Sequence, residues 1–296
     1  MSGHHHHHVS GRKLFITVIL NIIITLSQIA GGVISGSLAL LSDAMHNFSD
    51  VLALLIAYGA NRLAEKPRTK EYTFGLKRAE ILAALFNSLI LVGIGIFLIV
   101  EAVHKLFHPE PIESSWVIWL GILSIVLNTA SVLLIREDSH ENINIKAAYL
   151  HLLTDVMTSV AVVIGGILMA LWKVYWVDPL ISILIALYLI KSAVSLVKES
   201  ATILMQFAPQ SVDMDEIVHL IENEPEIDNV HHIHIWQLDD KNVFFEAHVD
   251  FKEDLPLSKC TKILDKLEEK LQKAGISHVT LQSEYQRKDS KEKVIP

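Results

Sequence analysis

Two pairs of histidine and aspartate share one spacing in this sequence. His46 and Asp50 are four residues apart, and so are His151 and Asp155 much later in the chain. Residues four apart on a helix lie on one face, one turn above the other. Both pairs lie within long apolar stretches, where an ionisable side chain costs about 2.5–3.5 kcal/mol on insertion scales and indicates a functional site. Two helices that each offer an imidazole and a carboxylate can together hold a metal ion.

Ligand chemistry favours zinc at this membrane quartet, defined as His46, Asp50, His151 and Asp155. Two imidazoles and two carboxylates in a tetrahedral set suit Zn²⁺, which accepts N and O ligands at about 2.0–2.2 Å. Carboxylates alone would favour Mg²⁺, Ca²⁺ or Mn²⁺, so the histidines favour zinc, with cobalt and cadmium as competitors. Metal binding requires neutral imidazole and ionised carboxylate, so protons compete with the metal. The quartet therefore has a physical basis for metal/proton exchange.

The alternative interpretation is that these polar residues only hold helices together, at about 0.6 kcal/mol per hydrogen bond in a membrane. That interpretation suits Asn21, Gln28 and Asn128. It suits the quartet poorly, because two buried carboxylates repel each other unless a cation lies between them. Asp43, seven residues before Asp50, lies on the same stripe. We interpret Asp43 as a pathway residue, an indirect partner of the ligands or a helix cap, rather than as a favoured ligand.

Six apolar segments must position these residues, each about 20 residues or longer, the length that crosses about 30 Å of hydrocarbon. They run approximately over 14–34, 38–61, 79–106, 115–135, 145–171 and 177–197. The chain has 296 residues, 51% of them hydrophobic, enough for a membrane domain and a small soluble domain. We divide it into a His-containing N-terminal tail (1–12), a six-helix transmembrane domain (13–204), a cytoplasmic metal-binding and dimerisation domain (205–286) and a disordered tail (287–296).

Charge distribution predicts orientation and excludes one class of partner. Lys and Arg concentrate before the first apolar segment, between the second and third, and between the fourth and fifth. Both termini are therefore expected in the cytoplasm. A net charge of −8 without a basic groove argues against nucleic acid. The single cysteine, Cys260, excludes a disulfide framework and a cysteine zinc site. The run of five histidines near the N-terminus is either a tag remnant or a native metal-collecting tail.

After about Met205 the pattern predicts a helix (213–223), a strand (230–238), a turn, a strand (242–251), a helix (257–274) and a strand (276–285). This αββαβ order gives a small two-layer α+β domain of about 80 residues. Its three strands carry a second cluster of candidate ligands: His231, His232, His234, His248, His278 and Glu284. We interpret the cluster as a regulatory metal site, the alternative being ordinary surface histidines. Arg78 and Glu199 are a candidate charge pair at the junction of membrane and soluble domains.

Several motifs resemble one family. SLALLSDAMHNFSDVLALL, YTFGLKRAEILAALFN, AYLHLLTDVMTSV, WVDPLISILIALYLI and VHHIHIWQL with FEAHVDF resemble the cation diffusion facilitator family, in its bacterial zinc/cobalt/cadmium efflux branch close to zinc transporters. The resemblance implies a homodimer with six transmembrane helices per subunit and a ferredoxin-like, metallochaperone-like cytoplasmic domain. It also implies export of divalent cations by proton antiport.

The same resemblance assigns ligands. It places the transport site on the membrane quartet and the cytoplasmic-domain ligands on His231, His248, His278 and Glu284. Gln282 departs from the family pattern, where some bacterial members have a histidine, and Gln206 stands where an aspartate is common. Tyr72 and Leu76 replace histidines that form an intermediate site in some members.

We therefore expect a zinc-preferring efflux antiporter in a bacterial inner membrane, not an enzyme. The Zn²⁺ ion is its cargo and a regulatory ligand, and no organic cofactor is expected. One alternative is the same class of transporter with manganese or iron as main substrate, and another is a membrane metal sensor that does not transport. An intramembrane zinc hydrolase would keep an open coordination position and a general base, and the sequence has no H-E-x-x-H motif.

Overall fold

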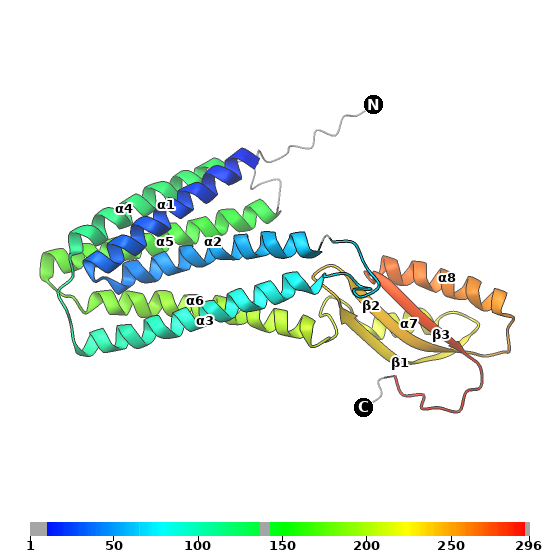
Figure 1. Ribbon diagram of the computed structural model, residues 1–296. Coiled ribbons are helices and arrows are strands. Elements are labelled where there is room, and N and C mark those ends of the chain that lie inside the picture. Colours follow the sequence, from blue (N-terminus) through cyan, green and yellow to red (C-terminus); the bar gives the residue numbers. More distant parts are fainter. Residues whose placement is uncertain (1–10, 65, 137–142, 294–296) are drawn as a thin grey trace. The chain divides into compact units, whose positions relative to one another are not determined.

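The computed structural model describes residues 11–64, 66–136 and 143–293 (Figure 1). The chain forms two compact units. The first contains the described residues up to Tyr58 together with Phe86–Leu196, and the second contains Gly59–Leu85 together with the chain from Val197 onward. The N-terminal histidines lie outside the described residues.

Six long helices confirm the predicted helical membrane domain. They are α1 (Gly11–Ser35), α2 (Leu38–Ala64), α3 (Arg78–Phe107), α4 (Ser114–Ile135), α5 (Ile143–Trp172) and α6 (Val177–Leu204). Their ends follow local chemistry: Gly36, with a φ of 71°, lies in the turn after α1, and Pro109 and Pro111 follow α3. Among the described residues, every one of these helices except α2 is long and apolar enough to cross a membrane. The exception carries the polar residues Asp43, His46, Asn47 and Asp50.

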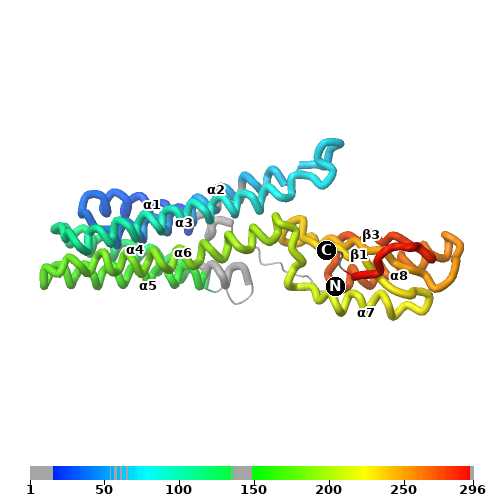
Figure 2. Tube along the Cα trace, turned by 90° about the horizontal axis from the view of Figure 1, so that it is seen from below, coloured from blue at the N-terminus to red at the C-terminus, as the bar shows by residue number. Residues whose placement is uncertain are grey.

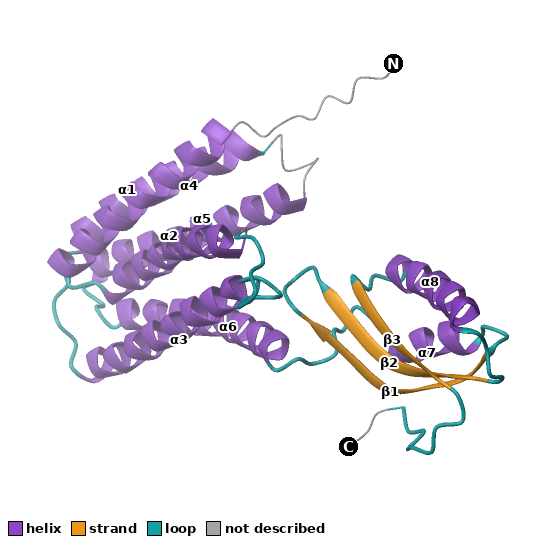
Figure 3. Cartoon of the chain, turned by 45° about the vertical axis from the view of Figure 1, so that its right-hand side comes forward, coloured by secondary structure: helices purple, strands orange, loops and turns teal. Residues whose placement is uncertain are grey.

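Within the first unit the helices run roughly along one common direction (Figures 1 and 2). Helix α4 lies against α1 and α5, and α3 lies beside α6 (Figures 1 and 3). Glycines permit the closest approaches. A Cβ atom on Gly95 would lie 2.5 Å from Cγ1 of Ile190, and one on Gly121 would lie 2.5 Å from Cγ2 of Val163. Small residues at these contacts let helix backbones approach each other, as is usual between membrane helices.

The second unit contains the α+β domain that the sequence predicts. Its elements are α7 (Met214–Glu222), β1 (Ile227–Gln237), β2 (Val243–Phe251), α8 (Leu257–Lys273) and β3 (His278–Glu284). The sheet order is β1-β2-β3, with β1 and β2 antiparallel and β2 and β3 parallel. The Oδ1 atom of Asp239 accepts hydrogen bonds from the backbone N–H groups of Lys241 (3.0 Å) and Asn242 (2.7 Å), which fixes the predicted β1–β2 turn.

Helices α7 and α8 cover one face of this sheet (Figure 3). Along α8, the buried positions Cys260, Ile263, Leu267 and Leu271 recur at helical spacing, so one face of the helix is apolar and packs on the sheet. Phe245 on β2 is 1% exposed within this core. The core therefore holds the middle strand firmly, and with it the neighbouring positions that carry candidate ligands.

Strand β1 contains a bulge among its histidines. His231 pairs with His248 and His234 pairs with Glu246, so β1 has one more residue than β2 between these pairs. His232, with a φ of 51°, lies in the bulge. The predicted alternation of the histidines along the strand is therefore interrupted. The rings of both His231 and His232 reach His248, with centroid distances of 5.4 and 4.6 Å.

The chain after Gln286 differs from the expected disordered tail. Residues 287–293 are described and lie against β1 at the bulge. The backbone N–H of His232 donates to the carbonyl of Glu292 (3.2 Å), and that of Ile233 donates to the carbonyl of Lys293 (2.7 Å). The backbone groups that the bulge frees from the β1–β2 ladder are the ones that bind the tail.

Candidate metal centres

The membrane quartet comes together between α2 and α5. Nε2 of His46 lies 3.3 Å from Oδ1 of Asp155, and Nε2 of His151 lies 3.1 Å from Oδ2 of Asp50. The two imidazole centroids are 5.6 Å apart. Ligand atoms of His46, His151 and Asp155 lie within 4.8 Å of one another. Each helix thus supplies one imidazole and one carboxylate, and each imidazole faces the carboxylate of the other helix.

Burial makes this arrangement costly without a cation. Asp155 is 0% exposed, and neither of its carboxylate oxygens has a hydrogen-bond partner. Nε2 of His46 is also buried without a hydrogen bond. The side chains of His151 and Asp50 are partly exposed, at 40% and 27%. Because an uncompensated buried carboxylate is strongly destabilising, the site favours a bound cation, either a metal ion or protons on the imidazoles.

Asp43 has a different environment from the quartet. It is 0% exposed and accepts hydrogen bonds from Nε2 of Gln28 (2.6 Å), Oγ1 of Thr158 (3.0 Å) and Oγ of Ser159 (3.2 Å). Both carboxylate oxygens are therefore held by neutral donors from α1 and α5. This geometry supports an indirect role, in which Asp43 fixes α2 relative to α1 and α5. The donors at Gln28, Thr158 and Ser159 have no motif that identifies them in the sequence.

Asp178 is a positioning residue that the sequence analysis did not assign. It lies in the first turn of α6 and is 0% exposed. Its carboxylate accepts hydrogen bonds from the backbone N–H of Leu38 (2.7 Å), the N–H of Ala39 (3.3 Å) and the hydroxyl of Ser37. It therefore caps the N-terminus of α2 from another helix. Since α2 carries His46 and Asp50, the cap helps to set their depth and rotation.

A second cluster lies on the sheet of the soluble unit. Nδ1 of His248 lies 2.9 Å from Oε1 of Glu284, and Nε2 of His231 lies 3.6 Å from Oε2 of Glu284. His231 is 0% exposed, and its Nδ1 lies 3.0 Å from Oδ1 of Asn229. If Nδ1–H donates to that amide oxygen, the lone pair of Nε2 is free for a ligand. Together with Asp289, these residues place ligand atoms within 4.8 Å of one another.

Electrostatics in this soluble cluster favour a neutral imidazole at His248. Burial lowers the pKa of His248 below its usual value, and the carboxylate of Glu284 opposes that shift only in part. A neutral ring is the form that binds metal. Oε2 of Glu284 is buried without a hydrogen-bond partner. The donor set and this orphaned acceptor fit a divalent cation.

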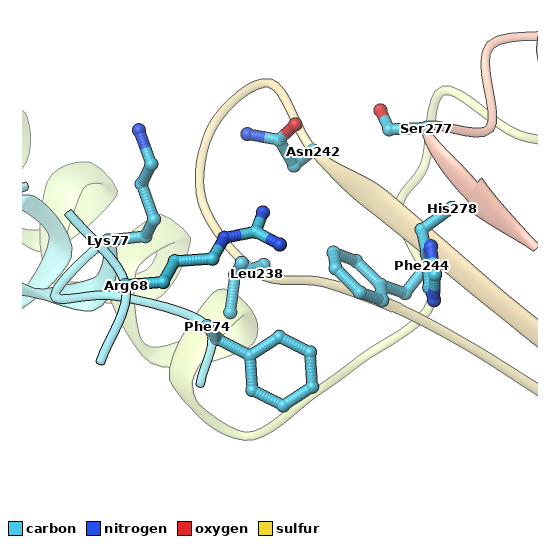
Figure 4. A pocket seen from close by; sticks show the side chains of 8 residues that line it. All are labelled: Arg68, Phe74, Lys77, Leu238, Asn242, Phe244, Ser277 and His278. Atoms are coloured by element: carbon cyan, nitrogen blue, oxygen red, sulfur yellow. The ribbon is translucent and has the colours of Figure 1, made fainter. Parts of the chain in front are cut away.

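His278 does not join this soluble cluster, contrary to expectation. It begins β3, a strand of seven residues, whereas Glu284 ends it, so the two lie about 20 Å apart at 3.3 Å per residue. The ring of His278 lies 4.8 Å from that of Phe244. Figure 4 shows His278 beside Phe244 in a pocket of about 350 Å³ that Arg68, Phe74 and Lys77 also line. Strand register separates this histidine from the other ligands, and Gln282 instead donates to Oε1 of Glu284 (2.7 Å).

The expected charge pair between Arg78 and Glu199 is not formed. Within the described part of the chain, no ion pair joins these two residues, and Nε of Arg78 is buried without a hydrogen-bond partner. Arg78 lies at the start of α3 and Glu199 near the end of α6, and their pairing was predicted only from their opposite charges. Opposite charges at two helix ends do not fix a contact between their long side chains.

Comparison with known proteins gives the family. Residues 14–205 match the model of the cation efflux transmembrane domain, and residues 209–286 match that of the cation efflux protein cytoplasmic domain. The chain is 35% identical over 285 residues to the "Cadmium, cobalt and zinc/H(+)-K(+) antiporter" of Bacillus subtilis (strain 168), covering 95% of this chain and 92% of that protein.

Two further relatives are also named as a cation efflux protein and a zinc transporter. The "Metal cation efflux system protein CzcD" of Cupriavidus metallidurans is 35% identical over 286 residues, which are 96% of this chain and 90% of that protein. "Zinc transporter ZitB" of Escherichia coli (strain K12) is 36% identical over 265 residues, 88% and 83% of the two chains. The two family models and these relatives define an integral membrane cation transporter. The chain belongs to the cation diffusion facilitator family, as the motifs predict, and it is a divalent metal efflux protein.

Proposed function

We propose that this protein exports zinc in preference to other divalent cations and exchanges it for protons at the membrane quartet. The observation that carries the proposal is the convergence of two buried histidine–aspartate pairs from α2 and α5, with Asp155 fully buried and without a hydrogen-bond partner. Such a site needs positive charge, and either a metal ion or protons can supply it.

The exchange follows from the titration of the ligands. A zinc ion that enters past the partly exposed His151 and Asp50 displaces protons from the imidazoles and takes both carboxylates as ligands. When the site faces the other side of the membrane, protons compete for the same imidazoles, and the metal leaves. Because the site has no thiolate, its affinity is low enough for release. The alternation between two states is the step that couples the two fluxes.

Zinc is preferred over manganese or iron because two of the four ligands are imidazoles. The printed names of three relatives support this choice, since they specify zinc, cadmium and cobalt, or zinc alone. The Bacillus relatives are named as zinc/H(+)-K(+) antiporters, which supports a proton counterflow and makes potassium a second candidate counter-ion. A sensor that does not transport has no use for charged ligands within the membrane segments.

The proposal also includes a regulatory metal site, a dimeric state and an orientation in the membrane. The cluster of His231, His248 and Glu284 is a regulatory metal site, supported by Oε2 of Glu284, which is buried and accepts no hydrogen bond. The protein acts as a homodimer in a bacterial inner membrane with both termini in the cytoplasm. The excess of Lys and Arg before the first apolar segment (14–34), in the loop after α2 and in the loop after α4 supports this orientation.

The experiment is metal uptake into inside-out vesicles that contain the purified, reconstituted protein. A pH gradient, acidic inside, is expected to drive uptake of Zn²⁺, with Cd²⁺ and Co²⁺ moving more slowly and Mn²⁺ and Fe²⁺ hardly at all. Asp155→Asn is expected to abolish uptake while keeping the shape of the side chain. Asp254→Asn, which changes an exposed aspartate of the soluble unit, serves as the matched control and retains uptake. Zinc uptake that survives in Asp155→Asn contradicts the site, and preferential uptake of manganese or iron contradicts the substrate.

A further inference from the structure

The C-terminal segment, residues 287–293, brings a lysine into the soluble metal cluster. Nζ of Lys291 lies 2.7 Å from Oδ2 of Asp250, 2.6 Å from Oδ1 of Asp289 and 3.7 Å from Oε2 of Glu284. It also lies 3.5 Å from Nε2 of His231. An ammonium group has three donors and no acceptor. It therefore stands among three carboxylates and one imidazole, in the place that the ligand set offers to a cation.

Charge balance distinguishes this lysine from an ordinary surface ion pair. Asp250 and Glu284 are only 5% and 6% exposed, so their charges are poorly screened by solvent. Arg287 is the other cation of the cluster, with Nη1 2.7 Å from Oε1 of Glu284. Three carboxylates facing Lys291 and Arg287 leave one net negative charge. A divalent ion in place of the Lys291 ammonium neutralises it.

The same segment is attached to β1. The backbone N–H groups of His232 and Ile233 donate to the carbonyls of Glu292 and Lys293, the two residues after Lys291. Lys291 is therefore held from two directions, by its side chain in the cluster and by the backbone pairing beside it. Removing the ammonium from the carboxylates removes one of these two attachments. The state of the cluster and the attachment of the segment are thus linked.

The segment also supplies a ligand. Oδ2 of Asp289 lies 3.6 Å from Nε2 of His231, and its carboxylate belongs to the group whose ligand atoms lie within 4.8 Å of one another. Its other oxygen, Oδ1, lies 2.6 Å from Nζ of Lys291, so the ammonium now occupies the side of this carboxylate that faces the cluster. When the ammonium leaves, Asp289 remains as an anionic ligand beside His231, His248 and Glu284.

We propose that the ammonium of Lys291 occupies the soluble metal site, that a divalent cation displaces it and takes Asp289 as a ligand, and that the displacement loosens residues 291–293, which follow Asp289, from β1. This inference rests on the proposed metal-binding role of the cluster. The C-terminal segment sets the affinity of the site through competition by Lys291. Release of residues 291–293 from β1 therefore accompanies binding of a divalent cation.

The test is a zinc titration of the purified full-length protein followed by hydrogen–deuterium exchange with peptide resolution. Local exchange separates this site from the membrane quartet and from the N-terminal histidines. Zinc is expected to slow exchange in β2 and β3 and, at the same concentration, to speed exchange at His232, Ile233 and residues 291–293. Lys291→Met is expected to lower the zinc concentration at the midpoint about tenfold, the change that losing one charge-assisted hydrogen bond implies. Asp289→Asn is expected to raise that midpoint.

The matched control is Lys293→Met, because Nζ of Lys293 binds Oε1 of Glu222 (3.0 Å), which lies outside the cluster. Its midpoint is expected to equal that of the wild type. Protection of β2 and β3 by zinc with no change in residues 291–293, or an equal midpoint in Lys291→Met, overturns the inference and leaves the metal site standing. Absence of any zinc effect on β2 and β3 in both proteins overturns the metal site and the inference together.

Discussion

Replacement of Asp178 by alanine tests how the helix that carries His46 and Asp50 is held in place. The variant removes the acceptor for the backbone N–H groups of Leu38 and Ala39, at 2.7 and 3.3 Å. Both donors are buried at the N-terminus of α2. Each buried donor left without a partner costs about 1–3 kcal/mol, and the longer bond contributes less, so we expect the free energy of unfolding to fall by about 2–4 kcal/mol.

The assay is equilibrium unfolding of the purified protein in mixed micelles, together with zinc transport in vesicles. Asp178→Asn keeps one side-chain oxygen and is expected to lie between wild type and Asp178→Ala in both measurements. Asp254→Ala, at an exposed position, controls for the loss of an aspartate. If Asp178→Ala unfolds and transports as the control does, the cap does not position α2, and the reasoning is refuted.

Three other predictions follow from described contacts. Asp43→Asn keeps the size of the side chain but turns an amide donor toward the donor of Thr158 or Gln28. Transport assays at graded zinc concentrations are expected to show a KM for zinc about tenfold higher than that of the wild type, which corresponds to the loss of one charge-assisted hydrogen bond. Hydrogen bonds from Lys270 and Lys266 lower the pKa of Glu224. The stability that these hydrogen bonds give the folded protein is therefore fully present above the unfolded pKa of Glu224, near 4.5, and is lost as pH falls through the lower folded pKa. Hydrogen exchange in α8 is expected to accelerate on acidification in the wild type and to change less in Glu224→Gln. Gly121→Val places a Cβ 2.5 Å from Cγ2 of Val163. The yield of folded protein, measured by size-exclusion chromatography, is expected to be well below that of the wild type. A yield equal to that of the wild type would show that α4 and α5 can separate at this contact.

The helical domain could be predicted because its determinants are local. Each apolar segment is long enough to cross a bilayer, and its ends coincide with features such as Gly36 and Pro109. The pairing of α2 with α5 follows from the repeated spacing of His46 with Asp50 and of His151 with Asp155. Two helices with the same unusual residues at the same interval have a common reason to face each other, and the structure brings the four side chains together.

The soluble site could be predicted only in part, because strand register and a bulge decide it. The extra residue in β1 brings His232 onto the ring of His248, which strict alternation along the strand does not predict. The parallel pairing of β3 sets Glu284 opposite Asp250 and carries His278 to Phe244 at the other end. Neither feature has a local signal in the sequence.

Lys291 and Asp289 show another limit of sequence reasoning. Both lie in a short, charged C-terminal segment whose composition is typical of a disordered tail. Their contacts depend on backbone groups that the bulge in β1 exposes and on carboxylates brought together by two strands. Long-range contacts of this kind depend on the folded sheet and leave no periodicity in the segment itself.

The most direct test of metal/proton exchange at the quartet is proton movement during zinc transport. Proteoliposomes with a trapped pH indicator receive a zinc gradient and no initial pH gradient. The account predicts that zinc entry drives protons out of the vesicles in wild type and in Asp254→Asn, and that Asp155→Asn shows neither flux. Zinc entry without proton movement in the wild type, or equal fluxes in Asp155→Asn, would contradict it.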